Sequence, residues 1–169
     1  MKFNLIALAV ASVIAAPAFA DGHAVDLTAT GDVEAGEKAF KQCVACHVVA
    51  DADGNTLAGK RAKTGPNLYA VVGRVAGSVE DFRYSKSIVA AGEAGLVWDE
   101  AAFVAYVQDP TGYLREYLDD DKARGKMSYK VRKEEDAVNL YAYLKDIGPE
   151  MEDAAMTEDK EGEETTTTN

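Results

Sequence analysis

Cysteine and histidine are scarce in this chain of 169 residues, which has two of each. The cysteines are Cys43 and Cys46, and one of the histidines, His47, follows directly. So few cysteines exclude the network of disulfides that stabilises many small secreted domains. They also restrict a zinc site, because tetrahedral zinc would need a fourth ligand from the distant His23 or from a carboxylate.

The sequence Cys43-Val44-Ala45-Cys46-His47 is the attachment signature of haem c. Two thiols at this spacing can form thioether bonds to the two vinyl groups of a haem, and the histidine places its imidazole under the iron. The alternatives are a thioredoxin-like redox pair, an ordinary disulfide or half of a zinc site. A redox pair is expected near a βαβ pattern, which the sequence does not contain. The motif therefore favours one covalently bound haem c.

Long apolar runs are also missing. The longest, residues 5–16, is shorter than the ~20 residues that span a bilayer. It follows the positive charge of Lys2 and precedes Ala18-Phe19-Ala20, an A-x-A cleavage signal. Residues 1–20 are therefore predicted to be a signal peptide cleaved after Ala20. We expect the mature protein to be exported to the periplasm.

Basic residues are outnumbered, with 18 Lys and Arg against 29 Asp and Glu. This balance disfavours nucleic acid as a partner, because phosphates repel an acidic protein. The acidic excess is strongest in residues 148–169, where eight carboxylates face only Lys160. That segment is predicted to be an acidic disordered tail, and residues 21–147 to form one domain.

Apolar periodicity and capping residues predict about five helices and no convincing strand. Asp32 and Asp99 are expected to cap two of them, and Asp109-Pro110 ends the second. We expect residues 48–64 to be a loop. The predicted fold class is all-α, with long loops wrapped around the haem. The expected helices span residues 33–45, 85–91, 100–108, 111–118 and 134–147.

The second axial ligand decides whether the iron transfers electrons or binds small molecules. Met127 lies in a polar, basic segment that is an unusual place for a core methionine. Met151 and Met156 lie in the predicted tail, where nothing would hold them near the iron. His23 is expected to be exposed near a frayed terminus. The sequence therefore favours His47 and Met127 as axial ligands.

Several further motifs follow the haem signature in a fixed order, and with them the chain resembles the class I cytochromes c. It is most similar to the soluble periplasmic cytochromes c of photosynthetic and denitrifying bacteria. The resemblance runs from about residue 31 to residue 147. The 49–61 and 119–124 segments are longer than in the shortest members, and the acidic tail is an extension. The motifs are Lys63-Thr64-Gly65-Pro66-Asn67-Leu68, Val72-Gly73-Arg74, the region of Tyr84, Trp98, Tyr106, Gly125-Lys126-Met127 and Leu140-Tyr141-Ala142-Tyr143-Leu144.

The resemblance implies the class I cytochrome c fold and roles for residues around the haem. The carbonyl of Pro66 would accept a hydrogen bond from Nδ1 of His47 and fix the ring. Tyr106 would lie near the sulfur of Met127, and Arg74, Tyr84 and Trp98 near the haem propionates. It also implies that the first and last helices pack together through Gly36, Phe40, Tyr143 and Leu144.

The family further implies a one-electron carrier that cycles between Fe(III) and Fe(II) and is not an enzyme. The expected donor is the membrane quinol:cytochrome c oxidoreductase. The expected acceptors are a haem-copper oxidase, a photosynthetic reaction centre or periplasmic reductases, and we expect a monomer. A haem peroxidase or a gas-binding bundle cytochrome are the rival classes. Basic side chains beside the two ligand segments would dock acidic partners, namely Lys41, Lys60, Arg61, Lys63, Lys122, Arg124, Lys126 and Lys130.

Overall fold

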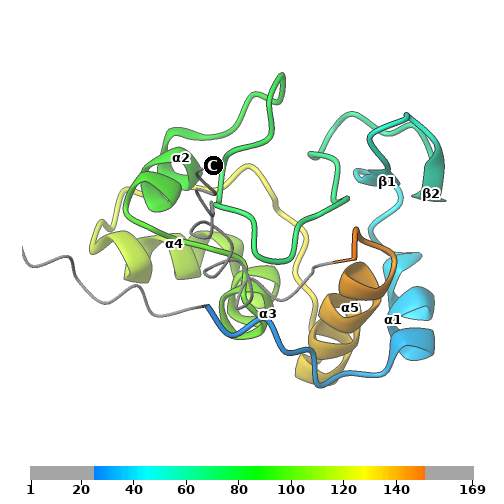
Figure 1. Ribbon diagram of the computed structural model, residues 1–169. Coiled ribbons are helices and arrows are strands. Elements are labelled where there is room, and N and C mark those ends of the chain that lie inside the picture. Colours follow the sequence, from blue (N-terminus) through cyan, green and yellow to red (C-terminus); the bar gives the residue numbers. More distant parts are fainter. Residues whose placement is uncertain (1–24, 151–169) are drawn as a thin grey trace, which may run out of the picture.

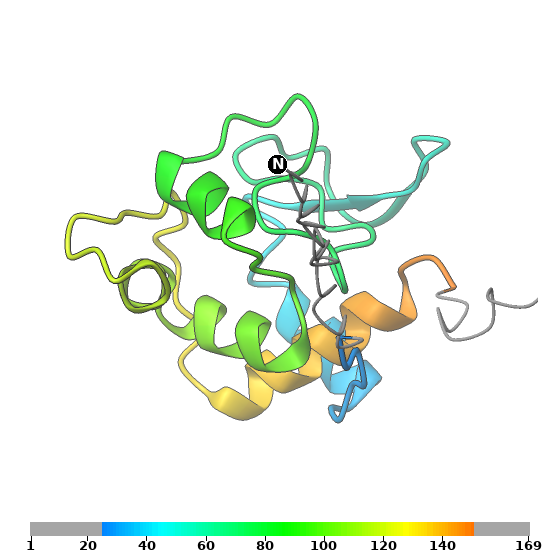
Figure 2. The ribbon, with the colours of Figure 1, turned by 60° about the vertical axis from the view of Figure 1, so that its left-hand side comes forward.

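The computed structural model describes residues 25–150 and contains five helices and two short strands in this range. No helix in this part of the chain combines the length and the apolar character needed to cross a membrane. Figures 1 and 2 show helices on several sides of the molecule, with long loops connecting them. In chain order the elements are α1 (Val33–Phe40), β1 (Val48–Ala50), β2 (Thr56–Gly59), α2 (Lys86–Glu93), α3 (Glu100–Gln108), α4 (Pro110–Leu118) and α5 (Glu134–Asp146).

Helices α1 and α5 lie side by side in both views, although they come from opposite ends of the described chain (Figures 1 and 2). Gly36 makes their close approach possible, because a Cβ added there would lie 2.0 Å from the carbonyl oxygen of Asn139. The rings of Phe40 and Tyr143 pack with their centroids 5.6 Å apart. The helix pairing implied by the resemblance is therefore present. It fixes the end of α1, from which the haem signature begins.

Side-chain caps set the start of the other helices. Asp99 accepts a hydrogen bond from the backbone N–H of Ala102, at 2.7 Å, and begins α3 where the sequence predicts. Asp109 ends α3 and caps α4, accepting from the N–H of Gly112, while Pro110 occupies the first turn of α4. Ser85 caps α2 in the same way. One aspartate between two helices thus turns the chain sharply.

The structure corrects two details of the predicted fold. Residues 48–64 are not all loop, because β1 and β2 pair antiparallel with Val48 opposite Gly59 (Figure 1). The strands have only three and four residues, and β2 is largely exposed, so neither has the alternation that marks a strand in sequence. Helix α1 ends at Phe40 rather than near residue 45, and hydrogen-bonded turns carry the chain on to Cys46.

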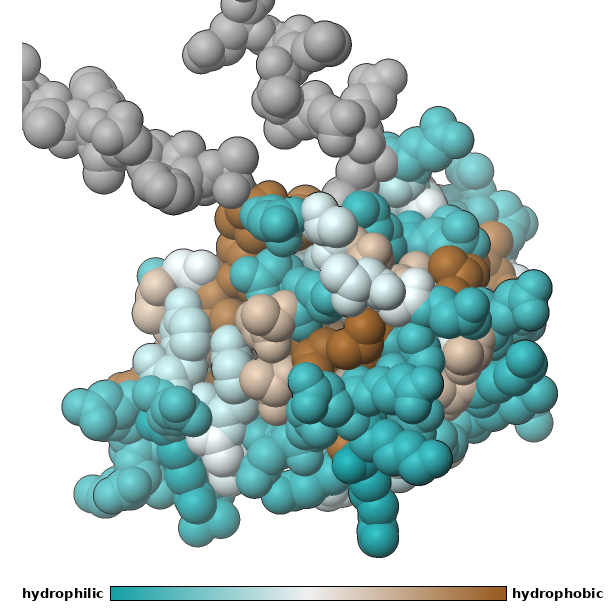
Figure 3. Space-filling view, turned by 90° about the horizontal axis from the view of Figure 1, so that it is seen from below, coloured by the Kyte–Doolittle hydropathy of each residue, from teal (hydrophilic) through white to brown (hydrophobic). Residues whose placement is uncertain are grey.

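Buried apolar side chains from α1, α3, α5 and the intervening loops form one core. The face seen from below in Figure 3 is mostly hydrophilic, with smaller apolar patches between polar side chains. The predicted signal peptide, residues 1–20, lies outside the described residues, and so does the predicted tail beyond Glu150. His23, Met151 and Met156 also lie outside them, so Met127 is the only methionine in the described part.

Candidate haem-binding site

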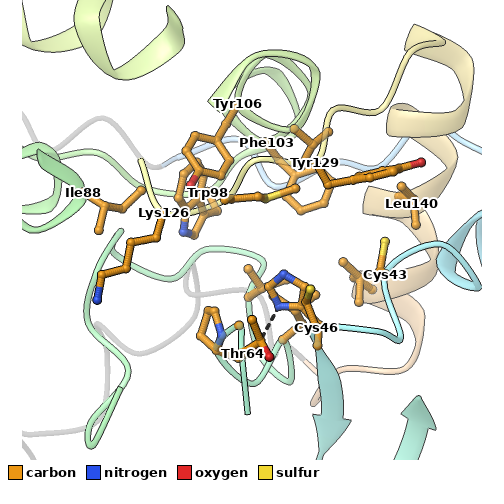
Figure 4. A pocket seen from close by; sticks show the side chains of 18 of the residues that line it. Cys43, Cys46, Thr64, Ile88, Trp98, Phe103, Tyr106, Lys126, Tyr129 and Leu140 are labelled. Carbon is orange, nitrogen blue, oxygen red and sulfur yellow. Dashed lines mark hydrogen bonds between the residues drawn. The ribbon is translucent and has the colours of Figure 1, made fainter. Parts of the chain in front are cut away.

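A cavity of about 300 Å³ lies between the α3–α5 side of the molecule and the loop that follows β2. Its lining is predominantly apolar and comes from segments far apart in the sequence. Cys43, Cys46, His47 and Met127, which the sequence singles out, all line it. Figure 4 shows Cys43 and Cys46 on one side of this space, with Trp98, Tyr106 and Tyr129 on the other.

Both cysteines are free thiols that are half-buried in the wall of the cavity. A tight turn holds them there, because the N–H groups of Cys46 and His47 both bond to the carbonyl of Cys43, at 3.0 and 2.9 Å. Burial, reinforced by the neighbouring Cys46, raises the pKa of Cys43 to about 11. In residues 25–150 no three Cys, His, Asp or Glu side chains are arranged to hold a metal ion. Two free thiols on one wall, without further metal ligands among these residues, suit the two thioether bonds of haem c better than a zinc site.

The ring of His47 is fixed by its neighbours. Its Nδ1 lies 2.9 Å from the carbonyl oxygen of Pro66, the hydrogen bond that the resemblance implies. Burial lowers the pKa of His47, and the bond to Pro66 partly opposes this effect. Since a carbonyl only accepts, Nδ1 carries the proton, and Nε2 keeps a lone pair for a metal.

Gly65 explains why this histidine can sit so close to the following loop. A Cβ added at Gly65 would lie 2.4 Å from Cε1 of the His47 ring, closer than any side chain allows. The backbone of residues 65–66 therefore packs directly against the imidazole. Only glycine permits the ring to keep both this position and its bond to Pro66.

The opposite wall carries the aromatic residues expected near the second ligand. The rings of Trp98 and Tyr106 pack with centroids 4.9 Å apart, and both line the cavity together with Met127. Burial raises the pKa of Tyr106 to about 12, so its phenol stays neutral at physiological pH. Met127 itself is half-buried, with its side chain available to the cavity rather than enclosed in the core.

Arg74 places a half-buried positive charge on the cavity wall. Its guanidinium donates to the carbonyls of Tyr69, at 2.9 Å, and Asn67, at 3.1 Å. Burial lowers the pKa of Arg74, and the nearby Tyr84 opposes this effect. Among the described residues no carboxylate lies within 4.0 Å of Arg74. A half-buried cation without an anionic partner among these residues suits the carboxylates of a bound haem.

The predicted docking cations fall into distinct groups. Lys126 alone lines the cavity, and its ammonium donates to the carbonyl of Arg83. Lys130 pairs with Asp109 at 2.8 Å, so its charge is already partly compensated. The remaining six are exposed: Lys41, Lys60, Arg61, Lys63, Lys122 and Arg124.

Sequence reasoning missed Arg83 and Lys86, two exposed cations in the segment 82–86. Their neighbours Phe82, Tyr84 and Ser85 line the cavity. The signal that could have found them is their position on either side of Tyr84, a residue of the matched motifs. They extend the basic character of the cavity's surroundings to a third segment.

None of the known protein-family models matches the chain. Individual proteins match it closely. Cytochrome c2 from Rhodovulum adriaticum is 66% identical over 119 residues, which cover 70% of this chain and 94% of that protein. Cytochrome c2 from Cereibacter sphaeroides is 53% identical over 149 residues, which cover 87% of this chain and 97% of that protein. This chain belongs to the cytochrome c2 family.

Solved structures agree with this assignment. The crystal structure of cytochrome c2 from Rhodobacter sphaeroides superposes with a TM-score of 0.68 at 58% identity, covering 69% of this chain and 96% of that one. Ferric cytochrome c-550 from Paracoccus versutus gives a TM-score of 0.67 at 41% identity, covering 71% of this chain and all of that one. The predicted class I cytochrome c fold is confirmed.

Membership in this family also confirms two predictions about chemistry. The chain is an electron-transfer protein rather than an enzyme, and its cofactor is one covalent haem c. The described residues fit that group: two free thiols and an oriented imidazole on one wall, and a half-buried guanidinium with no carboxylate paired to it in residues 25–150.

Proposed function

We propose that this protein is a periplasmic one-electron carrier in which Cys43 and Cys46 attach the haem and His47 and Met127 bind its iron. The observation that carries the proposal is the single apolar cavity that all four side chains line. The bound haem supplies the Fe(III)/Fe(II) couple. The chain supplies a dry site, a fixed imidazole and a thioether, a ligand that raises the reduction potential.

The remaining lining residues have supporting roles in this proposal. The Pro66 carbonyl holds the His47 ring at 2.9 Å, which keeps the ligand in one orientation in both oxidation states. Arg74, Tyr84, Trp98 and Tyr106 all line the cavity; the first three would hold the propionates, and Tyr106 would shield the Met127 side. Rigid ligands in a water-poor site change little when the iron changes charge, which favours fast electron transfer.

An electron would enter and leave where the cavity opens to solvent, and the cations around that opening would guide partners to it. Lys126 lines the cavity, and Lys41, Lys63, Arg83 and Lys86 directly adjoin lining residues in the sequence. In our proposal these cations, with the others predicted from sequence, steer acidic partner surfaces to this opening in weak, salt-sensitive encounters. The donor is the membrane quinol:cytochrome c oxidoreductase. The acceptor is a haem-copper oxidase, a photosynthetic reaction centre or a periplasmic reductase.

The proposal extends to the parts of the chain outside the described residues. Residues 1–20 act as the signal peptide, residues 21–147 form the haem domain as a monomer, and residues 148–169 form an acidic tail. Export fits the family, since haem c is attached outside the cytoplasm. Mass spectrometry of the exported protein tests the boundary, because cleavage after Ala20 leaves Asp21 as the first residue.

Electron-transfer rates with purified membrane complexes test the function. We expect the reduced protein to be oxidised rapidly by at least one acceptor complex, with a rate that falls steeply as ionic strength rises. Lys63→Glu should slow the reaction at low salt about threefold to tenfold, and the difference should shrink at high salt. Lys38→Glu is the matched control, because Lys38 is exposed on α1 and, unlike Lys63, does not adjoin a residue that lines the cavity.

Two outcomes would contradict the proposal. If every acceptor complex tested oxidised the reduced protein only slowly, the protein would not be an electron carrier between these complexes. An equal effect of Lys38→Glu and Lys63→Glu would show that total charge matters rather than a docking face.

A further inference from the structure

The loop that carries Met127 has little backbone support. From Lys126 to Lys130 it forms no backbone–backbone hydrogen bond within the described residues, and the next such bond joins the N–H of Val131 to the carbonyl of Val107. At its other end the N–H of Gly125 bonds only to a side chain, the hydroxyl of Thr111, at 3.4 Å. A loop without a backbone ladder opens locally at low free-energy cost.

Side chains hold this loop instead, and each reaches a different segment. The Lys126 ammonium donates to the Arg83 carbonyl, and Lys130 forms its ion pair with Asp109 at 2.8 Å. The Lys130 and Asp109 side chains are 54% and 52% exposed, so this pair contributes little. The third contact is different in kind, because the hydroxyl of Tyr129 donates to the side-chain carbonyl of Gln42.

This third contact joins the two walls of the haem cavity. Tyr129 lies two residues after Met127, and Gln42 directly precedes Cys43. Both residues line the cavity, and both are exposed to solvent, Tyr129 to 42%. Figure 4 shows Tyr129 extending across the cavity toward the side that holds Cys43 and Leu140. Among the side-chain contacts of residues 126–130, only this one reaches the segment that the haem itself anchors.

We infer that Tyr129 and Gln42 form a clasp that keeps Met127 on the iron and slows the entry of other ligands. Once the haem is attached to Cys43, Gln42 is a fixed point beside the cofactor. A hydrogen bond from Tyr129 to this point limits how far the Met127 loop can move away. The inference rests on the proposed binding of the iron by Met127, and it makes Tyr129 and Gln42 positioning residues.

Imidazole binding to the oxidised holoprotein tests the clasp. Imidazole can bind the iron only after Met127 leaves. The rate of imidazole binding at saturating concentration therefore equals the rate at which the loop opens. The disappearance of the methionine–iron absorption band measures this rate. Tyr129→Phe and Gln42→Leu each remove one partner and keep a similar shape. Because one hydrogen bond is lost, each should raise the opening rate about threefold to tenfold. The double variant should open no faster than either single variant, because both remove the same contact.

Two controls separate the clasp from a general loss of stability. Tyr117→Phe removes the hydroxyl of a similarly exposed tyrosine, which lies 3.4 Å from the Ala94 carbonyl and does not line the cavity. It should leave the opening rate unchanged. The guanidinium midpoint of global unfolding should change little in the clasp variants, because the loop opens before the core does.

Unchanged rates in both single variants, or a double variant whose increase equals the product of the two, would overturn the clasp. A wild-type protein without the methionine–iron band would overturn the proposed ligand itself. The two failures are therefore distinguishable in one set of spectra.

Discussion

Two parts of this protein that meet at the haem cavity are held in opposite ways. Helices α1 and α5 touch through their backbones at Gly36 and Asn139, and Asn139 also accepts from the N–H of Asp32 at 2.7 Å. The Met127 loop is held mainly by side chains that reach three other segments. The cysteine side of the site is therefore built on the rigid core, and the methionine side on the part that opens most easily.

This difference suits a site whose two ligands have different attachments. In the proposed site Cys43 and Cys46 hold the haem covalently, so His47 would remain near the iron even when the core fluctuates. Met127 has no such anchor and depends on the loop. The strength of the bond between Met127 and the iron should therefore depend on how firmly the loop is held. The free energy of global unfolding should depend on the packing of α1 against α5.

Hydrogen exchange gives the largest expected contrast between the two regions. The amides of Leu140 and Tyr141 lie in the buried centre of α5 and should exchange only through global unfolding. The amides of Ser128 and Tyr129 lack a hydrogen-bond partner among the described residues and should exchange at least about a thousandfold faster. Similar protection of the loop and of α5, measured by NMR on the reduced holoprotein, would contradict the comparison.

Gly36→Ala should lower stability more than the other substitutions in these two regions that are described below. Its Cβ would meet the carbonyl oxygen of Asn139 at 2.0 Å, and neither backbone can yield without separating the helices. We expect a loss of about 2–4 kcal/mol in the free energy of unfolding in guanidinium. Gly112→Ala is the comparison in α4, where the added Cβ meets the carboxylate of Asp109, a side chain that can move away at the cost of its cap on α4. Equal effects of the two substitutions would contradict the account, because the loss of stability at Gly36 would then not come from the close approach of the two helices.

The sequence predicts those features of the structure that are determined by residues close together in the chain. The bounds of α3 were predicted because Asp99 and Asp109-Pro110 mark its two ends within the helix's own sequence. The hairpin of β1 and β2 was missed because its strands are too short and too exposed to show a period. The four residues assigned to the haem and its iron come from a short motif and one unusual methionine, and all four line one cavity.

Contacts between distant residues could not be predicted in this way. Tyr129 and Gln42 are 87 positions apart, and neither residue type signals a partner by itself. Arg74 was assigned to the propionates by family resemblance alone. The structure alone shows that its guanidinium donates to two backbone carbonyls and to no carboxylate of the described residues.

Asn139→Leu tests the polar part of the helix pair. Asn139 is 8% exposed, and its side chain is the acceptor for the N–H of Asp32 at the start of α1. Removing this acceptor should lower the free energy of unfolding by about 1–2 kcal/mol, because the N–H loses its partner in a half-buried place. Asn55→Leu is the control and should cost less, since the Asn55 side chain only donates to the Asp51 carboxylate in an exposed turn. A larger loss for Asn55→Leu, in the same guanidinium titrations, would refute this account of the pair.

Lys130→Gln should have the smallest effect. It removes an ion pair whose two side chains are more than half exposed, and such pairs are screened by water and salt. We expect no measurable change in the guanidinium midpoint at moderate salt. A clear loss would show that the Met127 loop depends on its ion pair and would weaken the role given to Tyr129 and Gln42.

The central claim is that the haem iron lies between His47 and Met127, and the absorption spectrum of the oxidised protein tests it most directly. We predict a weak long-wavelength band from the methionine sulfur to the iron. This band should vanish in Met127→Ala, whose haem should remain attached to the chain in acidic solvent. A band that survives in Met127→Ala, or a wild-type protein with high-spin iron that binds carbon monoxide readily, would contradict the account.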